Sequence, residues 1–260
     1  MTDTEPEIII ERQGGVCVIR LNRPDARNAL TGSMLGTLAR TVTDADEDAE
    51  IGAIVITGAG DKAFCAGMDL RGFAASGNDS TGGREATEGF MRLLRAQHAT
   101  PVIGAVNGSA LAGGFELMLA CDLVVTADHA KFGLPEVKRG LIAGGTGVLL
   151  GARVPLAVAL ELTLTGETIE ASRAYELGLV NRVVPAADVL PTALALAEGI
   201  AANGPVAVRA TRELVRLSNR DVPAAEERLA HWQKVVFSSE DAREGAAAFM
   251  EKRPPVWKGR

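Results

Sequence analysis

Short apolar segments, of a length suited to buried strands, alternate along the chain with segments that fit helices. The clearest are AIVIT at 53–57, PVIGAVNG at 101–108 and DLVVTA at 122–127. Continuous apolar runs of this length are typical of parallel strands covered on both faces. A helix is predicted from Ser33 to Asp46, because its apolar residues recur on one face. The alternation therefore predicts an α/β fold.

The two ends of the chain follow other patterns. Residues 8–12 and 16–21 fit a β-hairpin. From residue 196 onward, Ala, Leu, Glu and Arg dominate, which favours helices. Breaks between these helices are expected near 203–205, 222–223 and 253–255. We therefore predict a core domain at 1–195 and a helical C-terminal region at 196–260.

The composition limits the function classes. The net charge of −6 and the pI near 5.3 argue against a broad nucleic-acid-binding surface. The three cysteines show no CxxC pairing and the three histidines lie far apart, so no metal site is predicted. The acidic N-terminal segment MTDTEPE does not fit a secretory signal. Reduced thiols fit the cytoplasm, where we expect the protein to act without a membrane.

Two glycine-containing loops, each after a predicted strand, suit the binding of a negatively charged oxygen. They hold Ala66-Gly67 and Gly113-Gly114, and each leads toward a predicted helix. Small residues let a ligand approach the backbone, and free N–H groups at a helix N-terminus favour negative charge. Two such loops that converge on one oxygen would form an oxyanion hole. Taken singly, each loop is better explained as a tight turn than as a binding site.

Two glutamates follow the second loop. Glu116 stands among apolar residues in the first turn of a predicted helix, and Glu136 follows Pro135 in FGLPE. A carboxylate in such surroundings is either a cap for the helix dipole or a buried acid or base. Two carboxylates beside an oxyanion hole suit the addition of water, because one activates the water while the other supplies a proton. The alternative for Glu136 is an ordinary acid in the first turn of a helix.

A dinucleotide-binding fold is the competing interpretation of IVITGAG at 54–60, where a strand enters a glycine-rich turn. The three glycines of GxGxxG are not all present. Short-chain dehydrogenases also need a tyrosine and a lysine four residues apart. The single tyrosine is Tyr175 and position 179 is leucine, so the residues for that chemistry are missing.

The chain resembles the crotonase superfamily, the enoyl-CoA hydratases and isomerases, along nearly its whole length. The segments that carry the resemblance are LNRPDARNAL (21–30), DKAFCAGMDL (61–70), PVIGAVNGSALAGGFELMLACD (101–122), KFGLPEVKRGLIAGGTG (131–147), LTGETIEASRAYELGLVNRVV (162–184) and AFMEKRPPVWKGR (248–260). The resemblance implies a spiral of repeated ββα units followed by a helical trimerisation region. It also implies a homotrimer or a hexamer built as a dimer of trimers.

The resemblance assigns roles to individual residues. It implies that Ala66 and Gly113 are the oxyanion-hole donors, that Glu116 and Glu136 are the hydratase glutamates, and that coenzyme A arrives with the substrate rather than as a cofactor. The positions implied to contact coenzyme A are Arg23, Ala26, Arg27, Ala29, Lys62, Ala63, Phe64, Asp69 and Leu70, with Phe249 and Lys252 reaching the coenzyme A of a neighbouring subunit. Because both glutamates are present, the resemblance favours hydration of a trans-2-enoyl-CoA to a 3-hydroxyacyl-CoA, and the reverse dehydration.

The sequence departs from the usual hydratase pattern near the expected acyl pocket. Ala143 replaces a proline common in relatives, VLLGARVPL replaces a polar stretch, and Phe115 stands where a small residue or cysteine is frequent. The segments FGLPEVKRG and PVWKGR are also similar to the carnitinyl-CoA dehydratase branch. Enoyl-CoA isomerisation or another enolate reaction is therefore the alternative activity. Non-enzymatic RNA binding, known in this superfamily, is disfavoured by the net charge.

Overall fold

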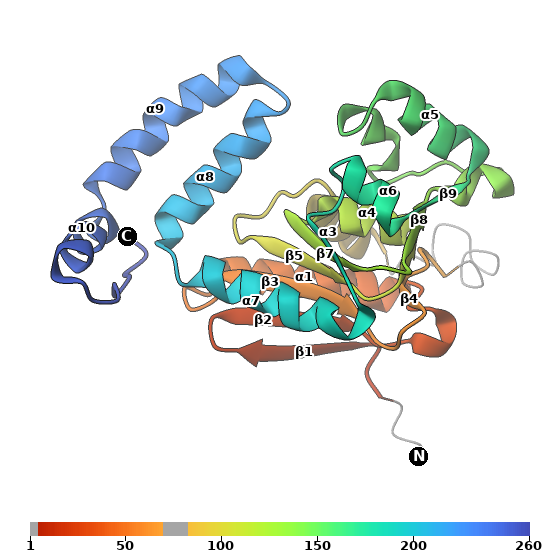
Figure 1. Ribbon diagram of the computed structural model, residues 1–260, viewed down its shortest axis with the longest axis horizontal. Helices are drawn as coiled ribbons and strands as arrows, with labels where there is room; N and C mark the ends of the chain where they lie inside the picture. The colour runs from red at the N-terminus through yellow and green to blue at the C-terminus, as the bar shows by residue number, and fades with distance from the viewer. Residues whose placement is uncertain (1–4, 70–82) are drawn as a thin grey trace.

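Two β-sheets form the core of the computed structural model, which describes residues 5–69 and 83–260 (Figure 1). Within that part of the chain, the larger sheet has six strands in the order β1-β2-β3-β5-β7-β10. Its strands are β1 (Ile8–Gln13), β2 (Val16–Leu21), β3 (Ala53–Gly58), β5 (Val102–Val106), β7 (Leu123–Ala127) and β10 (Arg182–Val184). Only β1 and β2 pair antiparallel, as the predicted hairpin requires, and the other neighbours are parallel.

The smaller sheet has the order β4-β6-β8-β9, with one antiparallel pair between β8 and β9. Its strands are β4 (Ala63–Cys65), β6 (Ser109–Leu111), β8 (Lys131–Gly133) and β9 (Thr168–Glu170). The sequence did not predict β4 or β6, because three residues are too few to show a strand pattern. The glycine-containing loops follow these two strands, so the smaller sheet sets the spacing of the loops.

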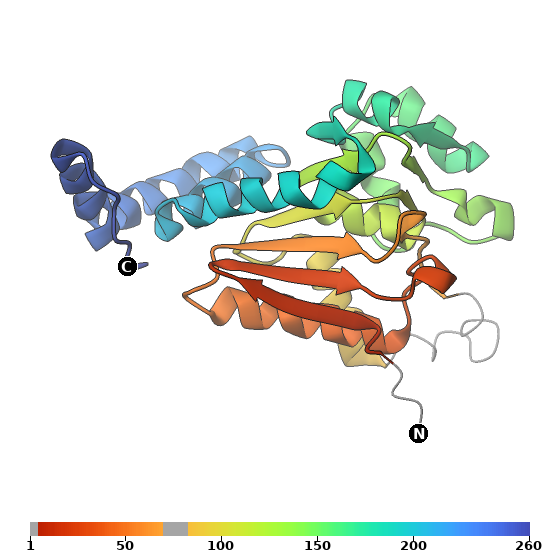
Figure 2. The same cartoon turned by 60° about the horizontal axis from the view of Figure 1, so that its bottom comes forward.

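Helices cover both faces of the larger sheet. The helices α1 (Gly32–Glu47) and α3 (Arg84–Leu94) pack together on one face, and α7 (Val189–Ala201) lies across the other (Figure 2). The hydroxyl of Thr31 accepts a hydrogen bond from the Met34 N–H and caps the start of α1. Strand β3 lies between these layers and is buried at every residue, which explains its uninterrupted apolar sequence. The predicted α/β fold is confirmed.

Shorter helical elements connect the two sheets. They are η1 (Pro24–Ala26), α4 (Gly113–Ala120), η3 (Pro135–Arg139), η4 (Gly147–Ala152), α5 (Leu156–Thr165), α6 (Ala171–Glu176) and η5 (Ala186–Asp188). Helix α4 joins β6 to β7 and is buried along its whole length. A helix without an exposed face needs core partners on every side, so α4 is held rigidly.

The C-terminal helices leave the core. They are α8 (Pro205–Ser218), α9 (Val222–Ser238) and α10 (Glu240–Glu251). Helix α8 turns by 111° from the segment that precedes it, and α8 and α9 run side by side away from the sheets (Figures 1 and 2). The predicted start of this region, residue 196, lies inside α7, which packs on the sheet through Ala193 and Ala197. The projecting part of the chain therefore begins later than predicted, at Pro205.

No single helix within residues 5–69 and 83–260 combines the length and the apolar character needed to cross a membrane.

Candidate active site

Helix α4 presents a free N–H group at its first residue, Gly113. The N–H groups of Phe115 and Glu116 both donate to the carbonyl of Ala112, at 2.9 and 3.0 Å. The Gly113 N–H has no acceptor among the described residues. An N–H group at the start of a buried helix carries part of the positive end of the helix dipole. As predicted, Gly113 therefore offers a donor to an anionic oxygen.

The loop after β4 offers a different donor from the one predicted. The N–H of Ala66 donates to the carbonyl of Arg27 at 3.0 Å, so it is not free for a substrate. The loop pairs with Leu30, whose N–H donates to Gly67 and whose carbonyl accepts from Asp69, at 2.8 and 2.9 Å. This pairing leaves the Met68 N–H without an acceptor among the described residues. The predicted Ala66 N–H is therefore occupied in this structure, and the Met68 N–H is the free one among the described residues of this loop.

The backbone segments that carry the free N–H groups of Met68 and Gly113 lie close together. A Cβ atom placed on Gly113 would lie 3.8 Å from the Met68 nitrogen and 3.9 Å from Oε2 of Glu116. A Cβ on Gly67, which has φ of +96°, would approach the Gly113 nitrogen to 3.1 Å. The two loops thus touch through glycine, and side chains there would force them apart.

Glu116 is buried in the first turn of α4, as predicted. Its Oε1 atom accepts hydrogen bonds from the N–H groups of Gly145 and Gly147, at 3.0 and 2.7 Å. Burial raises the pKa of Glu116 above its ordinary value of 4.5, and the backbone donors partly offset that increase. The donors belong to the segment GLIAGGTG at 140–147, which includes Ala143. That segment therefore supports the Glu116 carboxylate directly.

Glu136 lies in η3 and is half-buried. Its Oε2 atom is buried and has no hydrogen-bond partner among the described residues. Burial raises the pKa of Glu136, and the nearby negative charge of Glu116 raises it further. The two carboxyl groups are thus close enough for the charge of Glu116 to affect the pKa of Glu136. The hydratase roles of Glu116 and Glu136 stay a prediction.

Most of the residues predicted to contact coenzyme A lie together beside the Met68 loop. Arg23 binds the carboxylates of Glu7 and Asp69, at 3.1 and 3.0 Å, and the carbonyl of Ala29 at 2.6 Å. Lys62 is exposed. The other predicted residues in this cluster that the structure describes are Ala26, Arg27, Ala63 and Phe64. Ala63 and Phe64 are buried, and the Ala63 carbonyl already accepts a hydrogen bond from Asn28.

Asn28, which was not singled out from the sequence, holds this cluster in place. It is fully buried, with φ of +54°, and it donates to the carbonyls of Ala59 and Ala63, at 3.0 and 2.8 Å. Its side-chain oxygen accepts from the Arg23 N–H at 3.0 Å. The sequence signal that could have identified Asn28 is its amide side chain, which can bind backbone groups, within the polar turn 22–28.

Two groups of predicted residues do not join the cluster. Phe249 and Lys252 lie at the end of α10, on the far side of the molecule from α4 (Figure 1). Within one chain they therefore lie apart from the cluster around Arg23 (Figure 1). Leu70, expected to contact coenzyme A, lies outside the described residues. The loop 72–83, expected to shape the acyl site, also lies outside them except for Gly83.

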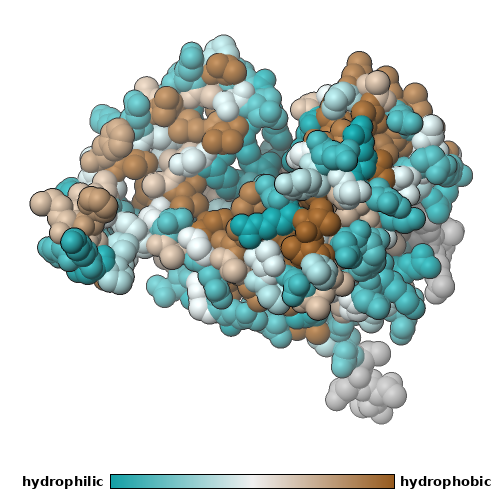
Figure 3. All heavy atoms as spheres, viewed as in Figure 1, coloured by the Kyte–Doolittle hydropathy of each residue, from teal (hydrophilic) through white to brown (hydrophobic). Residues whose placement is uncertain are grey.

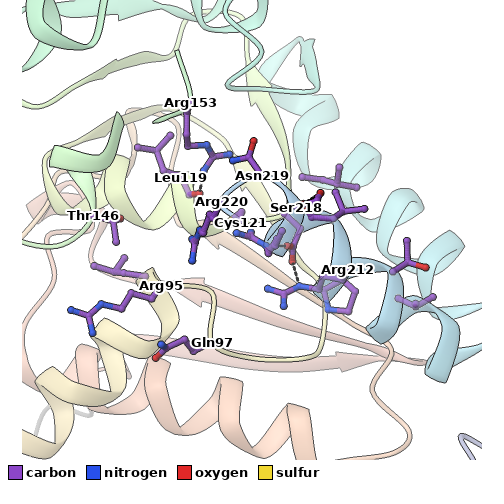
Figure 4. Close-up of a pocket in the computed structure, with 18 of the residues that line it drawn as sticks. Arg95, Gln97, Leu119, Cys121, Thr146, Arg153, Arg212, Ser218, Asn219 and Arg220 are labelled. Carbon is purple, nitrogen blue, oxygen red and sulfur yellow. Dashed lines mark hydrogen bonds and ion pairs between the residues drawn. The ribbon is translucent and has the colours of Figure 1, made fainter. Parts of the chain in front are cut away.

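A cavity of about 1340 Å³ lies elsewhere, between the core and α8 (Figure 4). Its lining includes Arg212 and Arg216, whose side chains both bind the carboxylate of Asp122. Arg153 points from the core toward Asn219 at the end of α8 (Figure 4). Neither glutamate of the candidate site lines this cavity. It belongs to the junction between the core and the C-terminal helices.

Known proteins share this fold and sequence over nearly the whole chain. The model of the enoyl-CoA hydratase/isomerase family matches residues 11–260. The enoyl-CoA hydratase EchA19 of Mycobacterium tuberculosis is 38% identical, over 99% of this chain and 98% of that protein. The carnitinyl-CoA dehydratase of Escherichia coli O157:H7 is 39% identical, over 96% of this chain and 98% of that protein. A crystal structure of an enoyl-CoA hydratase from Mycobacterium tuberculosis H37Rv is 46% identical with a TM-score of 0.88, over 98% of this chain and 100% of that one.

Proposed function

We propose that this chain, which belongs to the enoyl-CoA hydratase/isomerase family, adds water to a trans-2-enoyl-CoA and catalyses the reverse dehydration. The product of hydration is a 3-hydroxyacyl-CoA. The observation that carries the proposal is the pair of glutamates, Glu116 and Glu136, beside two free N–H groups. The close relatives named as hydratases support the same reaction.

The thioester oxygen of the substrate would accept hydrogen bonds from the N–H groups of Met68 and Gly113. As the oxygen of water bonds to C3, the electron pair of the double bond moves toward the thioester oxygen, where negative charge develops. Donors fixed in advance at that position are worth about 10²–10³ in rate each. Both donors belong to backbone that is packed tightly, so they need little reorganisation.

The environments of the two glutamates suggest separate roles. Burial raises the pKa of Glu116, but its two backbone N–H donors favour the ionised form, so it would remove a proton from the attacking water. Burial and the charge of Glu116 raise the pKa of Glu136, and this favours the protonated form of Glu136. It would donate its proton to C2. Each turnover leaves Glu116 protonated and Glu136 ionised, and a proton must then return to Glu136.

The loss of enoyl absorbance on hydration of crotonyl-CoA tests this proposal. The variants Glu116→Gln and Glu136→Gln keep the shape of the side chain but remove the carboxylate. We expect each to lower kcat by about 10²–10⁴, the usual contribution of a positioned acid or base. The matched control is Glu161→Gln, because Glu161 is exposed on α5. Unchanged activity in both active-site variants would exclude the proposed roles.

Isomerisation of an enoyl-CoA is the second candidate, and the loop that supports Glu116 favours it. That loop carries Ala143 and continues into the apolar segment VLLGARVPL rather than the polar stretch of relatives. Product analysis with a 3-enoyl-CoA separates the two activities. If the protein is only a hydratase, it should leave the 3-enoyl-CoA unchanged and act only when a 2-enoyl-CoA is supplied. If it is an isomerase, it should convert the 3-enoyl-CoA directly to the 2-enoyl-CoA.

Coenzyme A is proposed to bind as part of the substrate, with no separate cofactor. Arg23 holds the surrounding loop, and Lys62 offers an exposed positive charge for a phosphate. Lys62→Glu should therefore raise KM more than it lowers kcat. We further propose that the protein acts in the cytoplasm, because Cys17, Cys65 and Cys121 are buried and form no disulfide among the described residues.

We also propose that the chain assembles into a trimer, or into a pair of trimers, through its C-terminal helices. Phe237, Phe249 and Met250 have exposed fractions of 75%, 86% and 82% in the single chain. The space-filling view shows hydrophobic residues over α8 and α9 and a hollow between these helices and the core (Figure 3). Apolar side chains so exposed favour contact with another subunit. Light scattering after size exclusion should give three or six times the mass of one chain, and a monomer would exclude the assembly.

A further inference from the structure

Ala112 adopts a backbone conformation that favours glycine. It joins β6 to α4 with φ of +51° and ψ of −129°. Residues with a Cβ atom rarely occupy this region, and they stay there only when the surrounding structure holds them. The Ala112 N–H donates to Gly133 at 2.9 Å, and its carbonyl accepts from Phe115 and Glu116. Both peptide groups of Ala112 are thus fixed.

The torsion ψ of Ala112 orients the peptide between Ala112 and Gly113. That peptide carries the Gly113 N–H, which has no acceptor among the described residues. The strained conformation therefore determines where one of the two proposed donors points. A glycine at position 112 would keep these hydrogen bonds but would lose the methyl group that limits how far this peptide can tilt.

The methyl group of Ala112 also touches the other donor segment. A Cβ atom placed on Gly67 would lie only 2.8 Å from the Ala112 Cβ, so the methyl group packs on the backbone of Gly67. Gly67 immediately precedes Met68, which supplies the second N–H. A contact between a methyl group and backbone cannot be shortened without a clash, because protein interiors are close-packed.

We propose that Ala112 is a positioning residue that fixes the direction of the Gly113 N–H and its separation from the Met68 N–H. This inference rests on the proposed function, because it assumes that the two N–H groups bind the thioester oxygen. Ala112 itself touches no reacting atom. Its effect passes through the backbone of Gly113 and Gly67.

The test compares Ala112→Gly with a matched control, Ala96→Gly. Ala96 also has a positive φ, +53°, but it lies at the end of α3 outside the candidate site. Glycine relieves the strain at either position, so both variants should keep or raise Tm. We expect Ala112→Gly alone to lower kcat for crotonyl-CoA hydration by about tenfold, equivalent to about 1.4 kcal/mol, with KM changed less than about twofold.

A spectroscopic measurement separates this inference from the proposed function. The carbonyl stretch of a bound saturated acyl-CoA reports the polarisation of the thioester without any reaction. We expect the wild-type protein and Ala96→Gly to lower the frequency equally, and Ala112→Gly to lower it less. If Ala112→Gly matches the wild-type protein in frequency, the inference is wrong even where hydration is confirmed. If neither the wild-type protein nor its variants hydrate crotonyl-CoA but the carbonyl frequencies differ as expected, the proposed reaction is wrong and the positioning role stands.

Discussion

At the scale of single residues, the two glutamates differ in how the backbone supports them. Glu116 receives two N–H donors, whereas the Oε2 atom of Glu136 is buried without a partner among the described residues. An unpaired buried carboxylate destabilises the folded state when it is ionised. Glu136 should therefore reduce stability at neutral pH in return for its proposed role in catalysis.

The first prediction follows from the raised pKa of Glu136. At pH values between the ordinary pKa of 4.5 and the higher folded-state pKa, the folded state binds more protons than the unfolded state. The stabilisation present at low pH is therefore lost as pH rises through the folded-state pKa. We expect Glu136→Gln to be more stable than the wild-type protein at pH 8 and to lose this advantage toward pH 4. Urea unfolding across this pH range measures the difference in unfolding free energy between the variant and the wild-type protein. A difference that is constant with pH, or that has the opposite sign, contradicts the account.

The second prediction concerns Gly114, the second residue of α4. A Cβ atom there would lie 2.1 Å from the carbonyl oxygen of Cys65, which is backbone and cannot turn away. Gly114→Ala should cost about 3 kcal/mol of stability and lower hydration about 100-fold by displacing the donors. The control is Gly199→Ala in α7, which meets nothing within 4 Å and should stabilise the helix. Thermal unfolding and kcat measure both effects.

The residues of the site could be predicted only in part. Glu116, Glu136 and Gly113 stood out because a carboxylate or a glycine at a buried helix start needs an explanation. The second donor could not be predicted from the local sequence, because Ala66, Gly67 and Met68 all belong to one loop. Pairing with Leu30, almost 40 residues away in sequence, decides which N–H stays free. Asn28 was missed for a similar reason, since its partners lie in β4 and before it.

At the scale of helices and strands, α8 is attached to the core by a buried ion cluster. Asp122 accepts from Arg212 and Arg216 of α8, at 2.8 and 2.5 Å, and its side chain is 15% exposed. Burial alone would raise the pKa of Asp122, but the two guanidinium charges hold it below its ordinary value of 3.8. The carboxylate thus stabilises the fold at neutral pH, and this stabilisation is lost as pH falls through the folded-state pKa.

The third prediction is that Asp122→Asn costs about 3 kcal/mol, because it leaves two guanidinium groups without a counter-charge. The exposed pair of Arg173 and Glu176 provides the control. Glu176→Gln should cost less than about 0.5 kcal/mol, since solvent screens that pair. Denaturant unfolding of both variants at pH 7 compares the two costs. An equal, small cost would show that the cluster does not hold α8.

The long strands and helices were predictable because each carries its own periodic pattern. Residues 53–57 and the helix beginning near Ser33 appear in the structure as β3 and α1 within a residue or two. Strands β4 and β6 carry no such pattern, because sheet pairing rather than sequence periodicity defines them. The break at Ser239 between α9 and α10 was also missed, because no proline or glycine marks it. Its hydroxyl caps α10 instead.

At the scale of the whole molecule, α10 lies too far from α4 to complete the site of its own chain (Figure 1). The fourth prediction tests the expectation that Phe249 reaches the coenzyme A of a neighbour. Phe249→Ser should raise KM about tenfold with kcat nearly unchanged, the signature of lost binding away from the reacting atoms. Met250→Ser is the control, since Met250 is equally exposed but is not expected to contact the ligand. Equal KM values for the two variants would contradict the prediction.

The most direct test of the account is the source of the oxygen in the product. Crotonyl-CoA is incubated with the wild-type protein, Glu116→Gln and Glu136→Gln in water enriched in ¹⁸O, and the product is analysed by mass spectrometry. The account predicts that the wild-type protein forms 3-hydroxybutyryl-CoA carrying ¹⁸O at C3, and that each variant forms it at least about 100-fold more slowly. A product without ¹⁸O, or labelled product formed by both variants at the wild-type rate, would contradict it.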